Sequence, residues 1–385
     1  MFDFYNQESK RYKEVCEGKS KGKYPNIDEF INGDPTKISW NRGLKNDLGR
    51  FVNHTYQNAS LVTGLYRPFS KSHVYFSKYM NDMVYQMPRI FPDATVDNRV
   101  ICVTGRGENV GFSALMVNCV PNLHTIASGQ CFPLKLYEKN SGGDDLNDGE
   151  GIQEQNEMFT QSSAKSDDEY TVKDGISDEG LHHFQTAYPG KTITKEDLFY
   201  YIYGLLHSED YKKKYADNLS KELPRIPCVK KASDFWAFSK AGRDLAELHI
   251  NYESVAPYPV SFTGGSLFMD SFTDKDYRVE QMKFAKKGDK STVIYNHKIT
   301  MTNIPLEAYD YVVNGKPALE WVMERQAVTT HKDSGIVNDA NLWAIETLHD
   351  AAYPLKLFQR IITVSLETMK IVRALPRLDI VVKKS

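Results

Sequence analysis

Apolar and polar positions follow a helical period most clearly in the second half of the chain. After Thr194, apolar side chains recur at the spacing of one helix face: Leu198, Tyr201, Ile202, Leu205 and Leu206. An acidic residue three places after Thr194 is typical of a helix N-cap. Ser208 is expected to cap a second helix, and a third is expected over about 233–252. The period returns over 317–325 and 355–375, which predicts helices near the C-terminus.

A different pattern, with β-branched and aromatic residues between glycines and prolines, predicts strands elsewhere. Short runs of this kind occur at 61–66, 74–76, 99–104, 114–117 and 124–127. In the second half, two β-rich runs flank a Gly-Asp turn, which predicts a hairpin over 277–304. The N-terminal residues 2–17 show an imperfect helical pattern, and 24–40 have the proline and glycine content of a connector.

These elements together predict an α+β fold, with mixed β-sheet lobes and several helices. We expect a connector over 1–60 and a mixed α/β lobe over 61–140. An acidic loop or linker follows over 141–185, because this stretch holds few aliphatic residues. A second lobe is expected over 186–385, with helices in 195–252, the hairpin over 277–304 and helices in 317–375.

Net charge first argues against a partner such as nucleic acid, because the total is −2. Its distribution changes this picture. Residues 141–180 hold 12 acidic and 2 basic residues, a local balance of −10, so the rest of the chain carries −2 − (−10) = +8. A mildly basic body can present a basic face to phosphates, although many cytosolic proteins reach this charge without binding nucleic acid.

Cysteine usage and hydropathy point to the cytosol. The 5 cysteines are scattered singly and form no C-x-x-C, which disfavours a zinc knuckle or a disulfide framework. No apolar run approaches the roughly 18 residues that a membrane span needs, and the start has no signal-peptide pattern.

Motifs for chemistry are mostly missing from the sequence. It contains no P-loop, no H-E-x-x-H, no G-x-S-x-G and no Asn-Pro-Pro-aromatic tetrapeptide of amino-methyltransferases. A strand that leads into Gly105-Arg106-Gly107 and on to Gly111 has some likeness to a nucleotide or S-adenosylmethionine loop, but its glycine spacing favours a tight turn. His182 and His183 are candidate metal ligands, although adjacent histidines rarely converge on one ion.

With these motifs absent, the remaining functional signal in the sequence is a set of basic side chains near aromatic residues. They lie in four short regions: Arg42 and Lys45; Arg67, Lys71, Ser72 and His73; Lys212, Lys213 and Lys214; and Arg225, Lys230 and Lys231. Lysine and arginine neutralise phosphates, and polar side chains read base edges. The alternative for each cluster is a solvated surface, and the lysine triplet is expected on the solvent side of an amphipathic helix in either case.

Several longer strings resemble the C-terminal specificity region of type ISP restriction–modification enzymes. They begin with Lys37 to Leu44 and Leu65 to Phe69, and continue with Asp197 to His207, Leu223 to Pro227, Leu245 to His249, Ser334 to Asp339 and Leu375-Pro376. Their order matches that family and they span nearly the whole chain. Members of the family join a nuclease, a helicase-like translocase, an N6-adenine methyltransferase and a target-recognition domain in one polypeptide. This chain resembles only the part after the methyltransferase core.

The resemblance implies recognition of a short site in double-stranded DNA, so that other domains methylate an adenine or cleave. It implies no catalytic residue and no cofactor in this chain, with S-adenosylmethionine, ATP and Mg bound by the other domains. Expected DNA contacts are Lys71, Ser72, His73, Arg106, Lys230 and Lys231, with Arg67, Arg225, Arg42 and Lys45 as further candidates. The alternatives are a methyltransferase-like domain with a degenerate cofactor loop and a structural coupler that binds neither DNA nor cofactor.

Overall fold

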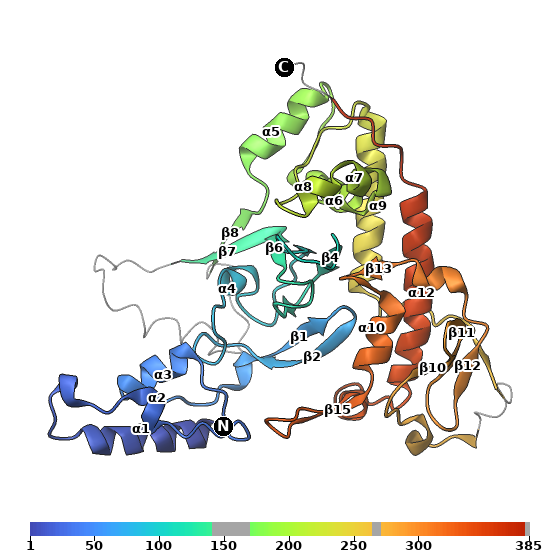
Figure 1. Ribbon diagram of the computed structural model, residues 1–385. Coiled ribbons are helices and arrows are strands. Elements are labelled where there is room, and N and C mark those ends of the chain that lie inside the picture. Colours follow the sequence, from blue (N-terminus) through green and yellow to red (C-terminus); the bar gives the residue numbers. More distant parts are fainter. Residues whose placement is uncertain (141–169, 264–270, 382–385) are drawn as a thin grey trace.

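The N-terminal residues fold into a small helical lobe that projects from one side of the molecule (Figure 1). In this computed structural model, which describes residues 1–140, 170–263 and 271–381, the lobe comprises α1 (Phe2–Cys16), η1 (Lys21–Lys23), α2 (Ile27–Phe30) and α3 (Arg42–Gly49). It has a core of its own, made by Tyr5, Tyr12, Cys16, Ile38, Leu44 and Leu48. The helical pattern over 2–17 is therefore confirmed as α1.

The centre of the molecule contains three small sheets. β1 pairs with β2 as a hairpin and with β5 in parallel, β3 lies between β4 and β6, and β7 pairs with β8. Their bounds are β1 Leu61–Arg67, β2 Ser70–Tyr75, β3 Val100–Val103, β4 Ala114–Val117, β5 Val120–Pro121, β6 Gln130–Pro133, β7 Lys135–Lys139 and β8 Tyr170–Asp174, with η2 Asn58–Ser60 and α4 Met87–Ile90 beside them.

A layer of helices covers the sheet of β3 and β4. It consists of α5 Asp178–Ala187, α6 Lys195–His207, α7 Glu209–Lys214, α8 Ala216–Leu219 and α9 Ala232–Ile250. Thr194 and Asp197 form the predicted capping box at the start of α6. α6 and α9 cross closely, because Gly204 and Gly242 face each other: a Cβ on Gly242 would lie 1.8 Å from the Tyr200 carbonyl oxygen.

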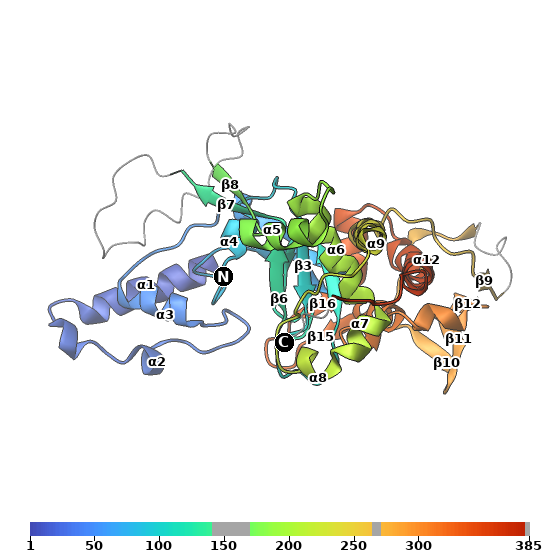
Figure 2. The same ribbon diagram turned by 90° about the horizontal axis from the view of Figure 1, so that it is seen from above.

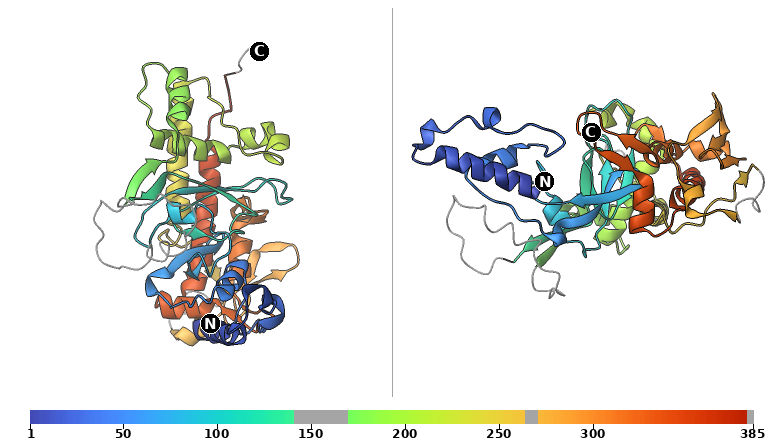
Figure 3. Two further views of the ribbon diagram at one scale, coloured as in Figure 1. Left: turned by 90° about the vertical axis from the view of Figure 1, so that its left-hand side faces the viewer. Right: turned by 90° about the horizontal axis from the view of Figure 1, so that it is seen from below.

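The C-terminal part wraps a long helix, α12, which runs beside α9 (Figure 1). Its elements are β9 Ser261–Phe262, η5 Asp274–Tyr277, β10 Lys283–Lys286, β11 Asp289–Ile294, β12 Thr300–Thr302, η6 Leu306–Tyr309, β13 Val312–Val313, β14 Lys316–Pro317, α10 Ala318–Arg325, β15 Val328–Thr330, β16 Val337–Asp339, α11 Ala340–Leu342, a π-helical turn η7 Trp343–Thr347, and α12 Tyr353–Arg373. Viewed from above, the N-terminal lobe, the central sheets and this part lie in a row (Figure 2). In the left view of Figure 3, the N-terminal lobe lies at the bottom and the last described residues after α12 lie at the top.

The α+β class is confirmed, and so are the long helices. Two local predictions are wrong. Residues 124–127 form no strand: the buried Thr125 there donates its hydroxyl to the Leu65 carbonyl oxygen at 2.6 Å, in a turn before β6. Residues 170–185 are not loop, because β8 pairs with β7 and Ser177 caps α5. The rest of the acidic stretch, 141–169, lies outside the described residues.

Candidate nucleic-acid interface

Lys71, the first of the expected contacts, is already bound within the protein. It lies on β2, and its Nζ forms an ion pair with Glu253 Oε2 at 2.5 Å. The other oxygen of that carboxylate accepts a hydrogen bond from the Tyr353 hydroxyl, also at 2.5 Å. The Lys71 side chain is only 22% exposed. Because its charge has an internal partner, Lys71 joins β2 to the turn after α9 and, through Glu253, to the start of α12.

The neighbouring residues of this hairpin are more open. His73 is exposed, with Nε2 3.2 Å from the Thr347 hydroxyl and its ring 4.7 Å from that of Trp343. Ser72 is half-buried on the same strand. Arg67 donates to the Tyr66 carbonyl oxygen and to Asn122 Oδ1, at 3.0 and 3.2 Å, which leaves it partly exposed. β2 is therefore placed against the turn η7.

Arg106 is the most available of the expected contacts. It is exposed at the tip of the turn between β3 and β4, and within the described residues it makes no ion pair or side-chain hydrogen bond. Gly107 and Gly111 have φ of +78° and +77°, which favours glycine at both places. The turn leads into a strand, β4, and not into a helix, so it lacks the helix N-terminus on which dinucleotide loops place a phosphate.

The remaining candidates lie in two separate places. Near the start of α9, Lys230 pairs with Asp379 at 2.7 Å and Arg225 with Glu222 at 2.8 Å, whereas Lys231 is exposed with no side-chain partner in the described part of the chain. On α3, Lys45 pairs with Asp28 at 2.6 Å, and Arg42 lies 3.6 Å from Asp82. The structure therefore does not gather the ten residues into one patch.

The β15–β16 hairpin also presents a candidate surface, although none of the expected DNA contacts lies on it. Ile336 and Val337 are 57% and 55% exposed, and Leu342, Ile345 and Leu348 follow with exposed side chains. Exposed apolar groups in such number on a folded domain mark interaction surfaces. Only the string Ser334 to Asp339 indicated this hairpin in the sequence.

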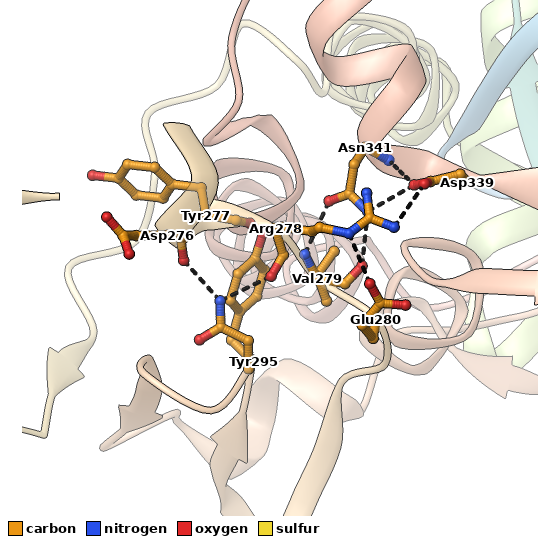
Figure 4. Close-up of polar contacts among 9 residues, drawn as sticks. Asp276, Tyr277, Arg278, Val279, Glu280, Tyr295, Asp339 and Asn341 are labelled. Atoms are coloured by element: carbon orange, nitrogen blue, oxygen red, sulfur yellow. Dashed lines mark hydrogen bonds and ion pairs between the residues drawn. The ribbon is translucent and has the colours of Figure 1, made fainter. Parts of the chain in front are cut away.

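An ion-pair network fixes the base of this hairpin (Figure 4). Arg278 bonds Asp339 at 2.9 Å and Glu280 at 2.7 Å. The buried Asn341 accepts a hydrogen bond from the Val279 amide at 2.9 Å and donates one to the Val279 carbonyl oxygen at 2.8 Å. Burial raises the pKa of the Asp339 carboxyl, but the hydrogen bonds from Asn341 and the Arg278 guanidinium together outweigh it and hold this pKa below its usual range. The hairpin thus projects from a rigid base.

Buried histidines lie below these surfaces, in the helical layer. The hydroxyl of Tyr203 accepts from the Met116 amide at 2.8 Å and lies 2.6 Å from His249 Nδ1. Burial lowers the pKa of His207 to about 3 and that of His249 well below its ordinary value. Both rings are therefore neutral and structural. In the described part of the chain no three His, Cys, Asp or Glu side chains are grouped to hold a metal ion, and His182 and His183 are exposed on α5.

The family model and the solved structures point to the same family. The family model of the type ISP C-terminal specificity domain matches residues 1–357, so the chain belongs to this family. Among solved structures, it is similar to a nuclease-deletion mutant of the type ISP restriction–modification enzyme LlaGI in complex with a DNA substrate mimic, at 30% identity and a TM-score of 0.76 over 99% of this chain. A search of curated proteins gave no significant match.

Two further structures are similar to the same extent. The ATP-dependent type ISP enzyme LlaBIII bound to DNA is 32% identical, with a TM-score of 0.76 over 99% of this chain. The DrdV–DNA complex is 29% identical, with a TM-score of 0.73 over 98%. This chain spans only 26%, 22% and 34% of the LlaGI, LlaBIII and DrdV chains, respectively. None of the described helices is long and apolar enough to cross a membrane.

Proposed function

We propose that this chain recognises a short sequence in duplex DNA, as the specificity domain of a type ISP restriction–modification enzyme. The observation that carries the proposal is that 98–99% of the chain matches proteins solved in complex with DNA or a DNA mimic. The Arg106 turn, the outer face of β2 and the hairpin β15–β16 are the surfaces we expect to meet the duplex. They combine free cations, polar groups and apolar side chains, which suit phosphates, base edges and thymine methyl groups.

In this proposal, recognition serves other domains. The chain positions an adenine for a methyltransferase domain, which takes the base out of the stack, and the state of the site controls a translocase and nuclease. S-adenosylmethionine, ATP and Mg are bound by those domains and not by this chain. The protein acts in the cytoplasm, where the DNA is. A cofactor loop at Gly105 is the weaker alternative, because no helix follows that turn.

Fluorescence anisotropy with a labelled duplex of random sequence tests the proposal. Binding should weaken by roughly 10³-fold between 50 and 200 mM salt if about six phosphates are contacted. A duplex without any anisotropy change at 50 mM salt, even when the chain is joined to a methyltransferase domain, would contradict it. Calorimetry with S-adenosylmethionine on wild type and Gly107→Val tests the alternative, which requires saturable binding that the variant loses.

A further inference from the structure

A cavity of about 240 Å³ lies between the turn after β3 and the short helices α7 and α8. Thr104, Gly105 and Gly111 line it on one side, and Lys212 lies on the other. The Thr104 hydroxyl donates to the Gly111 carbonyl oxygen at 3.1 Å, and the Gly107 amide donates to the Ser220 carbonyl oxygen at 3.2 Å. These bonds hold the two walls in place, so segments far apart in the sequence form one site.

Lys212 brings a charge to this cavity without an ion-pair partner among the described residues. Its side chain lines the cavity and is half-buried, beside Phe112 and Leu219, and it makes no ion pair or hydrogen bond with any described residue. Burial holds the pKa of the Lys212 ammonium below its ordinary value, opposed by the Glu209 carboxylate on the same helix. A charge in apolar surroundings without a partner is unfavourable, and an incoming anion would relieve this.

The lysine triplet is not one solvated face, which corrects the expectation from the sequence. Lys213 and Lys214 are exposed, whereas Lys212 turns toward the protein. The preceding residue, Tyr211, is buried and donates its hydroxyl to the Arg225 carbonyl oxygen at 2.8 Å. This bond fixes the orientation of α7, and so places Lys212 at the cavity.

We propose that Lys212 and Arg106 bind a phosphate group at this cavity. Arg106 does not line the cavity itself, but it is exposed on the same turn, between the lining residues Gly105 and Glu108, and it has no ion-pair partner in the described part of the chain. Glu108 also lines the cavity. Glu209 also acts on Lys212 from the same helix, so two cations face two carboxylates, and a site without a large excess of positive charge suits a phosphodiester with its single negative charge better than a polyphosphate.

The source of this phosphate is either the backbone of duplex DNA or a free phosphate. The DNA source rests on the proposed function, and it makes the cavity a point that sets the register of the domain on the duplex. Lys213 and Lys214 on α7 and Lys221 after α8 are also exposed, but they alternate with the exposed carboxylates of Asp210, Asp217 and Glu222, so any further phosphate contacts here would come from single lysines.

Duplex affinity and its salt dependence, measured by anisotropy on the whole chain, test the site. Lys212→Met keeps the length of the side chain and removes its charge. We expect about tenfold weaker binding at 50 mM salt and a salt slope smaller by about 1, as for one lost phosphate contact. Lys212→Arg should restore most of the affinity. The matched control is Lys191→Met, an exposed lysine between α5 and α6, which should change neither quantity.

A second measurement separates the two sources. Melting temperature is followed with inorganic phosphate added at 10 mM (roughly physiological) to wild type, Lys212→Met and Lys191→Met. If phosphate raises the melting temperature of wild type and Lys191→Met but not that of Lys212→Met, and the DNA affinity of Lys212→Met is unchanged, the phosphate site is supported and DNA is overturned as the source of the phosphate. If wild type binds DNA but Lys212→Met behaves as the control in both experiments, the site is overturned while the proposed function stands. If wild type does not bind DNA, even when joined to a methyltransferase domain, the proposed function itself fails.

Discussion

Two polar regions of the helical layer differ in whether their polar groups have partners within the protein. At the crossing of α6 and α9, Tyr203, His249 and Thr368 form a chain of hydrogen bonds with no access to solvent. A few residues further on, Lys212 faces a cavity and has no partner among the described residues. A buried network that is complete needs nothing from outside and is structural. A charge left without a counter-ion, in contrast, is where an external ligand gains most.

The tautomer of His249 follows from its neighbours. The Met116 amide donates to the Tyr203 hydroxyl, and His249 Nδ1, 2.6 Å away, is the acceptor for the hydroxyl's own proton among its described contacts, so we assign that proton to the Tyr203–His249 bond. The proton of the ring is then on Nε2, which donates to the Thr368 hydroxyl at 2.9 Å. These bonds join β4, α6, α9 and α12 directionally, in addition to the apolar packing between them.

The largest effect is expected from the crossing that holds this network. In Gly242→Ala the new Cβ would lie 1.8 Å from the Tyr200 carbonyl oxygen, so α6 and α9 must separate. We expect a loss of about 3–5 kcal/mol in the free energy of unfolding, measured by urea denaturation. Gly22→Ala is the matched control: nothing lies within 4 Å of its Cβ position, so its stability should change by less than about 0.5 kcal/mol. Equal stability of the two variants would contradict the close crossing.

A smaller effect is expected from the network itself. His249→Phe keeps an aromatic ring against Tyr311, which stacks on His249 at 5.2 Å, but it leaves the hydroxyls of Tyr203 and Thr368 without their partner. The expected cost is about 2–3 kcal/mol, because buried polar groups lose their hydrogen bonds. Thermal unfolding at pH 7.5 measures it. A variant as stable as wild type would show that the network contributes no more than packing.

The pH dependence of stability tests whether the two buried histidines are neutral in the folded protein. The folded-state pKa values of His207 and His249 lie below the unfolded value, about 3 for His207, so at mildly acidic pH the unfolded chain binds more protons. Their contribution is present above about pH 6.5 and is lost as the pH falls, by at most about 1.4 kcal/mol per pH unit for each histidine. His249→Phe should therefore reduce the slope of stability between pH 6 and 4.5. An unchanged slope would contradict a neutral, buried His249.

Much of the fold could be predicted from the sequence where one local signal decides it. Thr194 with Asp197 places the start of α6 correctly, and the apolar period gives α9 and α12. Residues 124–127 were misassigned because a β-like composition says nothing about the contact of Thr125 with Leu65, which is distant in the chain. For the same reason, the pairing of β8 with β7 across residues 141–169 has no local signal.

The candidate site was less predictable, because ion pairs depend on tertiary contacts. Lys71 and Arg106 look alike as basic residues in loop-rich regions, yet Lys71 meets Glu253 and Arg106 meets no described partner. Lys212 was assigned to a solvated face, since nothing in the sequence shows that the Gly105 turn packs against α7 and α8. Residue type predicted the kind of surface, but tertiary structure determines which cations are free.

The smallest effects on stability are expected when Lys71, which has an ion-pair partner, is compared with Lys231, which has none among the described residues. Lys71→Met leaves Glu253 partly buried with only Tyr353 as partner, so we expect a loss of about 1–2 kcal/mol in stability. Its affinity for duplex DNA should stay within about twofold of wild type, because the Lys71 charge is already neutralised. Lys231→Met removes an exposed charge without a described partner, so its stability should stay within about 0.5 kcal/mol of wild type.

For DNA affinity we expect the opposite order, with a larger loss in Lys231→Met than in Lys71→Met. Lys231→Met should weaken duplex binding several-fold at 50 mM salt and lower the salt slope by about 1, if Lys231 meets a phosphate. Urea denaturation and anisotropy on the same protein preparations measure both quantities. Weaker DNA binding by Lys71→Met with unchanged stability would show that its ion pair with Glu253 opens when DNA arrives. Lys71 would then be a DNA contact despite its internal ion pair, and having a partner within the protein would not distinguish structural cations from DNA-binding ones at the β1–β2 hairpin.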